Sequence, residues 1–196
     1  MMRRGILGGT FDPPHLAHLF AAEAAYRELD LDVVTWVPAG APWQKVDEVV
    51  SSGEHRWEMT KLAIEGVDYF DADDQELVRD GWTYTFDTLN TFVSDELFLI
   101  LGSDSAVAFP TWHRFKEVAQ LAVMAVVARP GSSRSDVESA VDSCIWIGSP
   151  ELGISSTGLR ERVAQGKSIR FLVPNLVIEY IDQHNLYRGA AAASSA

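Results

Sequence analysis

The sequence contains a single cysteine, Cys144, and no long run of apolar residues. One cysteine excludes an internal disulfide and a metal site built from several cysteines, and we expect Cys144 to be a buried bystander. Because no stretch reaches the roughly 18 apolar residues that a bilayer requires, no membrane-spanning helix is predicted. The N-terminal "MMRRGILGGTFD" lacks the long apolar region of a signal peptide, so it is interpreted as a strand. These absences together predict a cytoplasmic protein.

Positive charge is also scarce. The chain has 16 Lys plus Arg against 28 Asp plus Glu, for a formal net charge of −12. Nucleic acids and anionic membranes are bound largely through a basic field, so this balance argues against both as partners. A small anionic ligand stays compatible with the composition if a few cations are gathered locally.

The chain has the length and apolar content to bury one core, since 47% of its 196 residues are apolar. We expect a single domain over residues 1–188, followed by a disordered tail of small residues at 189–196. Residue patterns predict strands and helices in alternation. The expected strands are 4–10, 32–38, 69–78, 96–102, 122–131 and 144–149, and the expected helices are 16–29, 52–66, 83–94, 111–120, 135–141, 155–166 and 174–187.

Alternating strands and helices favour an α/β fold, Rossmann-like and doubly wound, with a mainly parallel sheet and helices on both faces. In such folds ligands bind where the strands end at their carboxyl termini. The residues that follow each predicted strand are therefore the first candidates for a functional site.

The first such loop is "GGTFDPPHLAH", which lacks the G-x-G-x-x-G fingerprint of dinucleotide-binding folds. Gly8 and Gly9 allow the backbone to approach a ligand closely, and the following helix presents free N–H groups. His15 and His18 stand one turn apart and can point the same way. Two imidazoles at a helix start suit a phosphate group, although a solvated surface pair or a pair of metal ligands would share this spacing.

Two further loops carry polar groups. Lys45 lies in "PAGAPWQK" after the second strand, where it is either a ligand-binding residue or an ordinary surface lysine. In "ISSTGLR", Ser155, Ser156 and Thr157 can cap a helix, and Arg160 faces the same end one turn later. This motif is either a plain cap or a second phosphate-binding helix start.

The motifs "GGTFDPPHLAH" and "ISSTGLR" resemble those of the nucleotidyltransferase superfamily, which are (H/T)-x-G-H and [IV]-S-S-T-x-x-R. The stretches "GWTYTFDTL", "LGSDS", "FPTWHRF", "VARPG" and "LVPNLVIEYIDQHNLY" narrow the resemblance to bacterial nicotinate-mononucleotide adenylyltransferases. It covers residues 5 to about 187, and the set of motifs is far more specific than any one of them. Ala17 departs from the pattern, which has glycine there. It could crowd a ligand on the helix start, and we expect it to be tolerated.

The resemblance implies a reaction. The phosphate of nicotinate mononucleotide attacks the α-phosphate of ATP, pyrophosphate leaves, and nicotinate adenine dinucleotide forms, as a step of NAD biosynthesis. Such a transfer needs positioning and electrostatics and no protein nucleophile. Mg²⁺ is expected with ATP, held mostly by phosphate and water, with no metal site on the protein itself. The expected partners are ATP and the mononucleotide, and the choice between monomer and homo-oligomer is left open.

The resemblance also implies residue roles at the ATP end. Catalytic roles fall on His18, His15, Lys45 and Arg160. Contacts with ATP are implied for Gly8, Gly9, Thr10, Phe11, His15, His18, Gly102, Asp104, Ile154, Ser155, Ser156, Thr157 and Arg160. Asp104 is expected to accept from ribose hydroxyls, its alternative being a plain helix cap.

Mononucleotide binding is implied for Thr85, Asp104, Trp112, His113 and Lys45. Trp112 is expected to stack on the pyridine ring, and its alternative is a core aromatic. The Thr85 hydroxyl and the backbone N–H of His113 are expected to bind the nicotinate carboxylate, a donor set that favours the acid over the amide. By its position Arg129 lies near the nucleotide, with no contact assigned to it.

Three rival interpretations are weighed against this one. An adenylyltransferase acting on phosphopantetheine typically has threonine where His15 stands and lacks the "TYT" and "FPTW" stretches. A nucleotide-sensing module would not need the intact set of His15, His18, Lys45 and Arg160. A metal-dependent hydrolase built on the two histidines would need further ligands in a suitable arrangement.

Overall fold

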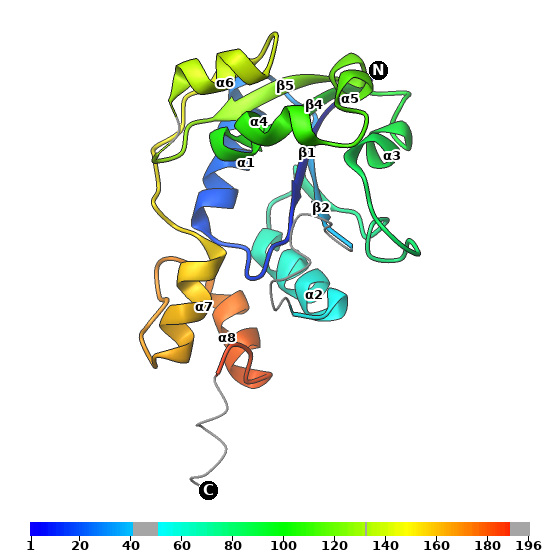
Figure 1. Ribbon diagram of the computed structural model, residues 1–196. Coiled ribbons are helices and arrows are strands. Elements are labelled where there is room, and N and C mark those ends of the chain that lie inside the picture. The colour runs from blue at the N-terminus through cyan, green and yellow to red at the C-terminus, as the bar shows by residue number, and fades with distance from the viewer. Residues whose placement is uncertain (41–50, 132, 189–196) are drawn as a thin grey trace, which may run out of the picture.

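The computed structural model describes residues 1–40, 51–131 and 133–188, and in them a parallel sheet forms the centre of the molecule (Figure 1). The strand order is β3-β2-β1-β4-β5-β6, and every described pair of neighbours is parallel. The strands are β1 (Arg3–Gly9), β2 (Val33–Pro38), β3 (Phe70–Ala72), β4 (Glu96–Gly102), β5 (Ala122–Val127) and β6 (Ile145–Ile147). The order reverses between β1 and β4, which creates the crevice where such sheets bind ligands.

Helices cover both faces of this sheet, which confirms the predicted doubly wound α/β fold (Figure 1). They are α1 (Leu16–Glu28), α2 (Gly53–Ile64), α3 (Thr85–Asn90), α4 (Ser103–Ala108), the 3₁₀ turn η2 (Phe109–Thr111), α5 (Phe115–Leu121), α6 (Arg134–Ala140), α7 (Ser156–Ala164) and α8 (Asn175–Gln183). Successive side chains of β4 point to opposite faces of the sheet and pack in different hydrophobic cores. Leu99 packs with Val118 of α5, whereas Phe98 packs with Ala22 of α1.

A third core lies at the end of the molecule where α2, α7 and α8 meet (Figure 1). Met59 of α2, Leu159 of α7, and Val177 and Ile181 of α8 are buried together there. This core fixes the start of α7 relative to the sheet, and α7 carries the second candidate phosphate motif.

Several predicted elements are shorter than their sequence patterns indicated, among them the helices expected over 83–94 and 174–187, which span Thr85–Asn90 and Asn175–Gln183. Two other differences have a clear local cause. The strand expected over 69–78 is confined to Phe70–Ala72, because the N–H groups of Leu77 and Val78 both donate to the carbonyl of Asp74 and form a turn. The helix expected over 111–120 begins only at Phe115, because Arg114 has a left-handed backbone with φ of 55°.

The short α4 directly after β4 was not predicted, since a six-residue helix carries too few periodic positions to be recognised. Cys144 is half-buried and not fully buried as expected. No described helix has the length and apolar character to cross a membrane. The predicted tail at 189–196 lies outside the described residues.

Candidate active site

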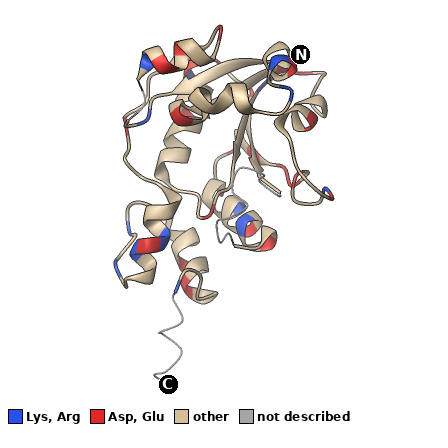
Figure 2. Cartoon of the chain, in the orientation of Figure 1, with Lys and Arg blue, Asp and Glu red and all other residues tan. Residues whose placement is uncertain are grey.

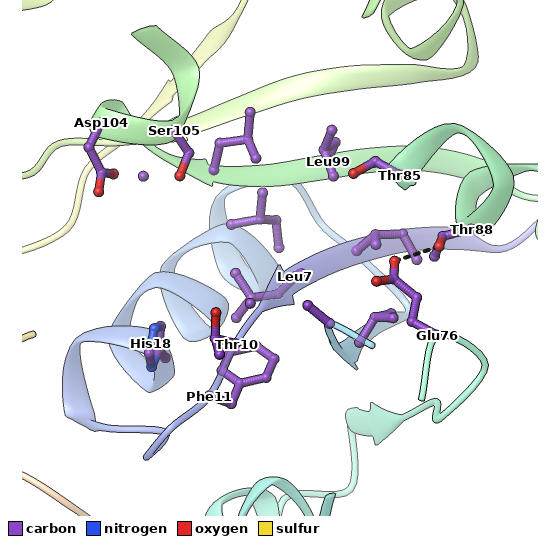
Figure 3. Close-up of a pocket in the computed structure, with 18 of the residues that line it drawn as sticks. Leu7, Thr10, Phe11, His18, Glu76, Thr85, Thr88, Leu99, Asp104 and Ser105 are labelled. Atoms are coloured by element: carbon purple, nitrogen blue, oxygen red, sulfur yellow. Dashed lines mark hydrogen bonds between the residues drawn. The ribbon is translucent and has the colours of Figure 1, made fainter. Parts of the chain in front are cut away.

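A cavity of about 410 Å³ opens at the carboxyl ends of β1 and β4 (Figure 3). The structure brings most of the predicted site residues together around it. These are Gly8, Gly9, Thr10, Phe11, His15, His18, Thr85, Gly102, Asp104, Trp112, His113, Ser155, Ser156 and Thr157, and Arg129 joins them. Residues from six of the sequence motifs therefore line one cavity at the switch point of the sheet.

Two predicted residues, Ile154 and Arg160, lie outside the cavity lining. Ile154 is partly buried against the third core. Arg160 does not line the cavity; its guanidinium donates to the carbonyl of Asp12 at 2.9 Å and to Thr157 Oγ1 at 3.3 Å. Lys45 lies outside the described residues.

The turn after β1 is shaped by its two glycines. A side chain at Gly8 would meet no atom within 4 Å, so this backbone is open to a ligand. A Cβ at Gly9 would lie 2.8 Å from the ring of Phe11, which is buried against this turn. Phe11 itself has φ of 51°, an unusual left-handed conformation for an aromatic residue that reverses the chain toward α1.

His15 and His18 form a stacked pair at the start of α1. Their ring centroids are 3.7 Å apart with an interplanar angle of 18°. The backbone N–H of His15 donates to Nδ1 of His18 at 3.2 Å. Because Nδ1 accepts a hydrogen bond, the neutral ring carries its proton on Nε2, which makes Nε2–H the donor that His18 can offer a ligand.

His15 is almost fully buried, with 1% of its surface exposed. Burial, followed by the positive charge of Arg129, lowers the pKa of His15 to about 3. The ring is therefore neutral at ordinary pH, and fixed positive charge in the cavity lining comes from Arg129. The acidic excess of the chain is spread over helices and loops in many parts of the molecule (Figure 2).

Arg129, which the sequence left without a contact, lies beside the end of β4. Its backbone N–H donates to Ser103 Oγ at 2.9 Å, and its Nη1 is 3.7 Å from Asp104 Oδ2. A Cβ at Gly102 would come within 2.8 Å of both side chains, so a larger residue there would require them to shift. Gly102 is the N-cap of α4, and Asp104 lies in the first turn with an exposed side chain, which differs from a plain helix cap.

Aromatic residues gather at the far end of the cavity. Trp112 lines it while packing against Phe109 at a centroid distance of 5.6 Å, so this residue serves the core as well as the cavity. The rings of Tyr84 and His113 lie 4.2 Å apart. Thr85 is the first residue of α3. The aromatic rings at this end offer faces on which a planar ligand could stack.

Sequence reasoning missed Glu76, which also lines the cavity and accepts a 2.6 Å hydrogen bond from Thr88 Oγ1 (Figure 3). Glu76 follows β3 within a stretch predicted as strand, so no pattern marked it as a site residue. Ala17, the position that departs from the motif, is not among the residues that line the cavity.

Comparisons with known proteins show the family of this chain. Residues 6–162 match the family model described as Cytidylyltransferase-like. A protein of Dehalococcoides mccartyi named "Probable nicotinate-nucleotide adenylyltransferase" is 40% identical, over 95% of this chain and 97% of its own length. A protein of the same name from Oceanobacillus iheyensis is 39% identical, over 95% of this chain and 97% of its own.

A solved structure of Plasmodium falciparum nicotinic acid mononucleotide adenylyltransferase complexed with NaAD superposes with a TM-score of 0.81. It covers 95% of this chain and 98% of that one at 20% identity, a level that supports the shared fold. The family match and the two bacterial relatives go further, and the chain belongs to the cytidylyltransferase-like family and, within it, to the nicotinate-nucleotide adenylyltransferases.

Proposed function

We propose that this protein transfers AMP from ATP to nicotinate mononucleotide, releasing pyrophosphate and forming nicotinate adenine dinucleotide in NAD biosynthesis. The observation that carries the proposal is the single cavity that joins the histidine pair at the start of α1 to the aromatic end around Trp112. One end suits a chain of phosphates and the other a pyridine ring. A relative at 40% identity carries the corresponding name.

In this reaction an oxygen of the mononucleotide phosphate forms a bond to the α-phosphorus of ATP. The bond from that phosphorus to the bridging oxygen breaks, and its electron pair leaves with pyrophosphate. The nucleophile is already an anion, so the protein has no proton to remove. Its task is to align two anions and to place donors where negative charge grows.

His18 is the donor proposed for the α-phosphate. The backbone N–H of His15 occupies its Nδ1, so Nε2–H is fixed as the hydrogen-bond donor before substrate arrives. A donor oriented in advance costs no reorganisation during the reaction. Ser155, Ser156 and Thr157 at the start of α7 are proposed to meet the β- and γ-phosphates, with Arg160 beside them.

The phosphates of ATP call for a divalent cation, for which Mg²⁺ is our proposal. Asp104 and Glu76, the two carboxylates that line the cavity, lie toward its opposite ends (Figure 3). Among the described residues no three His, Cys, Asp or Glu side chains are grouped to hold a metal. This donor set fits a cation held mainly by substrate phosphates and water, which would neutralise charge on the transferred phosphoryl group.

Substrate choice is proposed to reside at the aromatic end. Trp112 would stack on the pyridine ring, while Thr85 and the backbone of His113 would offer donors to the carboxylate. The amide analogue carries an NH₂ that would face those donors, so the acid should be preferred.

The test is an assay of pyrophosphate release by the purified protein with ATP and Mg²⁺. Nicotinate mononucleotide, nicotinamide mononucleotide and phosphopantetheine are each offered as acceptor. The proposal expects the fastest release with nicotinate mononucleotide. Faster release with phosphopantetheine would reassign the substrate, and no release with any acceptor would favour a protein that binds nucleotides without turnover.

A further inference from the structure

A buried carboxylate behind the cavity has no part in the reaction described above. Asp12 is fully buried, and its two carboxylate oxygens have separate donors. Oδ1 accepts from the hydroxyl of Tyr187 at 2.6 Å, and Oδ2 accepts from the backbone N–H of Ser51 at 3.0 Å. A carboxylate that is shielded from water requires such donors, because each lone pair left unsatisfied is costly.

The same segment connects the two candidate phosphate motifs. Arg160 Nη1 donates to the backbone carbonyl of Asp12 at 2.9 Å, and Ser156 Oγ donates to the carbonyl of Pro13 at 2.9 Å. Residues of α7 are thereby bonded to Asp12 and Pro13, which lie shortly before His15. The distance between the two helix starts depends on the position of residues 12 and 13.

The carboxylate of Asp12 lies beyond direct hydrogen-bonding distance of the Arg160 guanidinium. Its Oδ2 is 4.0 Å from Arg160 Nη1, whereas a direct charge-assisted bond between such groups measures about 2.8 Å. Tyr187 and Ser51 draw the carboxylate toward themselves, so its negative charge acts on the guanidinium without a direct bond between the two side chains.

Tyr187 is well suited to this role. Its backbone has φ of 62°, a left-handed conformation that turns the side chain inward after the end of α8. Burial and the adjacent Asp12 raise the pKa of the Tyr187 phenol, so the hydroxyl stays a donor at any ordinary pH.

We infer that Tyr187 and Asp12 are positioning residues that set the place of Arg160 at the start of α7, and with it the affinity for the phosphates of ATP. The inference rests on the proposed function, since it takes ATP as the ligand of that helix start. If the Tyr187 hydroxyl is removed, Asp12 loses a donor, and the guanidinium of Arg160 lies 4.0 Å from its Oδ2. The carboxylate then shifts, and Arg160, which its charge attracts, moves away from the place at the start of α7 that the phosphates require.

The experiment compares Tyr187→Phe with wild type under steady-state conditions. We expect KM for ATP to rise about fivefold to tenfold, the scale of one ordinary hydrogen bond, with KM for nicotinate mononucleotide unchanged. Tyr180→Phe is the matched control, because the Tyr180 hydroxyl bonds His55 and not Asp12. That control should leave both KM values at the wild-type level.

A double-mutant cycle separates positioning from general stability. In an Arg160→Ala background, Tyr187→Phe should no longer change KM for ATP, because the group it acts through is gone. An equal rise in both backgrounds, or a rise in both KM values, would overturn the inference.

Asp12→Asn provides an independent second variant, should Tyr187→Phe fail to fold. It keeps an oxygen for Tyr187 and removes the charge that faces Arg160, so KM for ATP should again rise alone. An unchanged KM for ATP in a folded Asp12→Asn protein counts against the inference. Failure of the proposed function would look different, since wild type itself would release no pyrophosphate.

Discussion

The two ends of the cavity are formed by different kinds of residue. At the phosphate end, the start of α1 carries a glycine turn and two stacked imidazoles held by backbone hydrogen bonding. At the other end, Trp112 and the Tyr84–His113 pair present rings, and these are set on a 3₁₀ turn and short loops. Under our proposal the first end accelerates the transfer and the second selects the substrate.

The comparison indicates that the more deeply buried side chains lie at the end where negative charge develops during the transfer. His15 is buried and its pKa lies far from neutrality, so the phosphate end keeps one protonation state. His113 at the aromatic end is exposed. Substitutions in the histidine pair should therefore change rate or stability, and substitutions at the aromatic end should change KM for the mononucleotide.

The largest expected effect comes from His18→Ala. Removing a donor that stabilises the transition state typically lowers turnover by about 100-fold or more, with a smaller effect on substrate binding. Steady-state kcat measures this change. His184→Ala, outside the cavity, is the control and should keep wild-type turnover. Near-normal kcat in His18→Ala would remove His18 from the proposed mechanism.

The next effect concerns the pH dependence of stability. His15 has a folded-state pKa of about 3 against 6.5 for a free histidine, so between these values the unfolded chain binds more protons. Stability should thus fall as pH drops below 6.5, by up to about 1.4 kcal/mol per pH unit from this residue. Urea unfolding of wild type and His15→Gln from pH 7 to 4.5 measures it. Equal slopes for both proteins would show that His15 does not contribute.

At the aromatic end, Trp112→Ala should raise KM for nicotinate mononucleotide about tenfold, the scale of one lost stacking contact, and leave KM for ATP unchanged. Trp57→Ala on α2 serves as the control, because Trp57 lies outside the cavity lining. If Trp112→Ala altered only KM for ATP, the two ends of the cavity would have been assigned the wrong way round.

The smallest effect is expected from Ala17→Gly, which restores the family's glycine. Ala17 does not line the cavity, so turnover should stay within about twofold, while the loss of helix propensity costs about 1 kcal/mol of stability. Thermal unfolding and kcat are measured on the same preparation. A large gain in turnover would show instead that the alanine crowds a ligand.

The sequence predicted the elements with strong patterns and missed those set by single backbone angles. The strand at 96–102 was predicted with the bounds of β4, because a buried apolar run ending in glycine has few alternatives. The late start of α5 depends on the left-handed Arg114, which no periodicity reveals.

The candidate site follows the same division. Motif residues such as His15, Trp112 and Thr157 line one cavity because they follow strands of one parallel sheet or cap a helix beside it. The contact between Asp12 and Tyr187 joins residues 175 positions apart, and neither residue carries a local signal of it. Hydrogen bonds between residues this far apart depend on how the chain packs, so local sequence patterns do not predict them.

That contact has a consequence for how the protein is made. Asp12 leaves the ribosome well before Tyr187, the donor to its Oδ1, because 175 positions separate the two residues. At typical rates of synthesis this delay is about ten seconds or more. Until then the Asp12 carboxylate lacks its phenol donor, so this contact forms only after the whole span from Asp12 to Tyr187 has been synthesised.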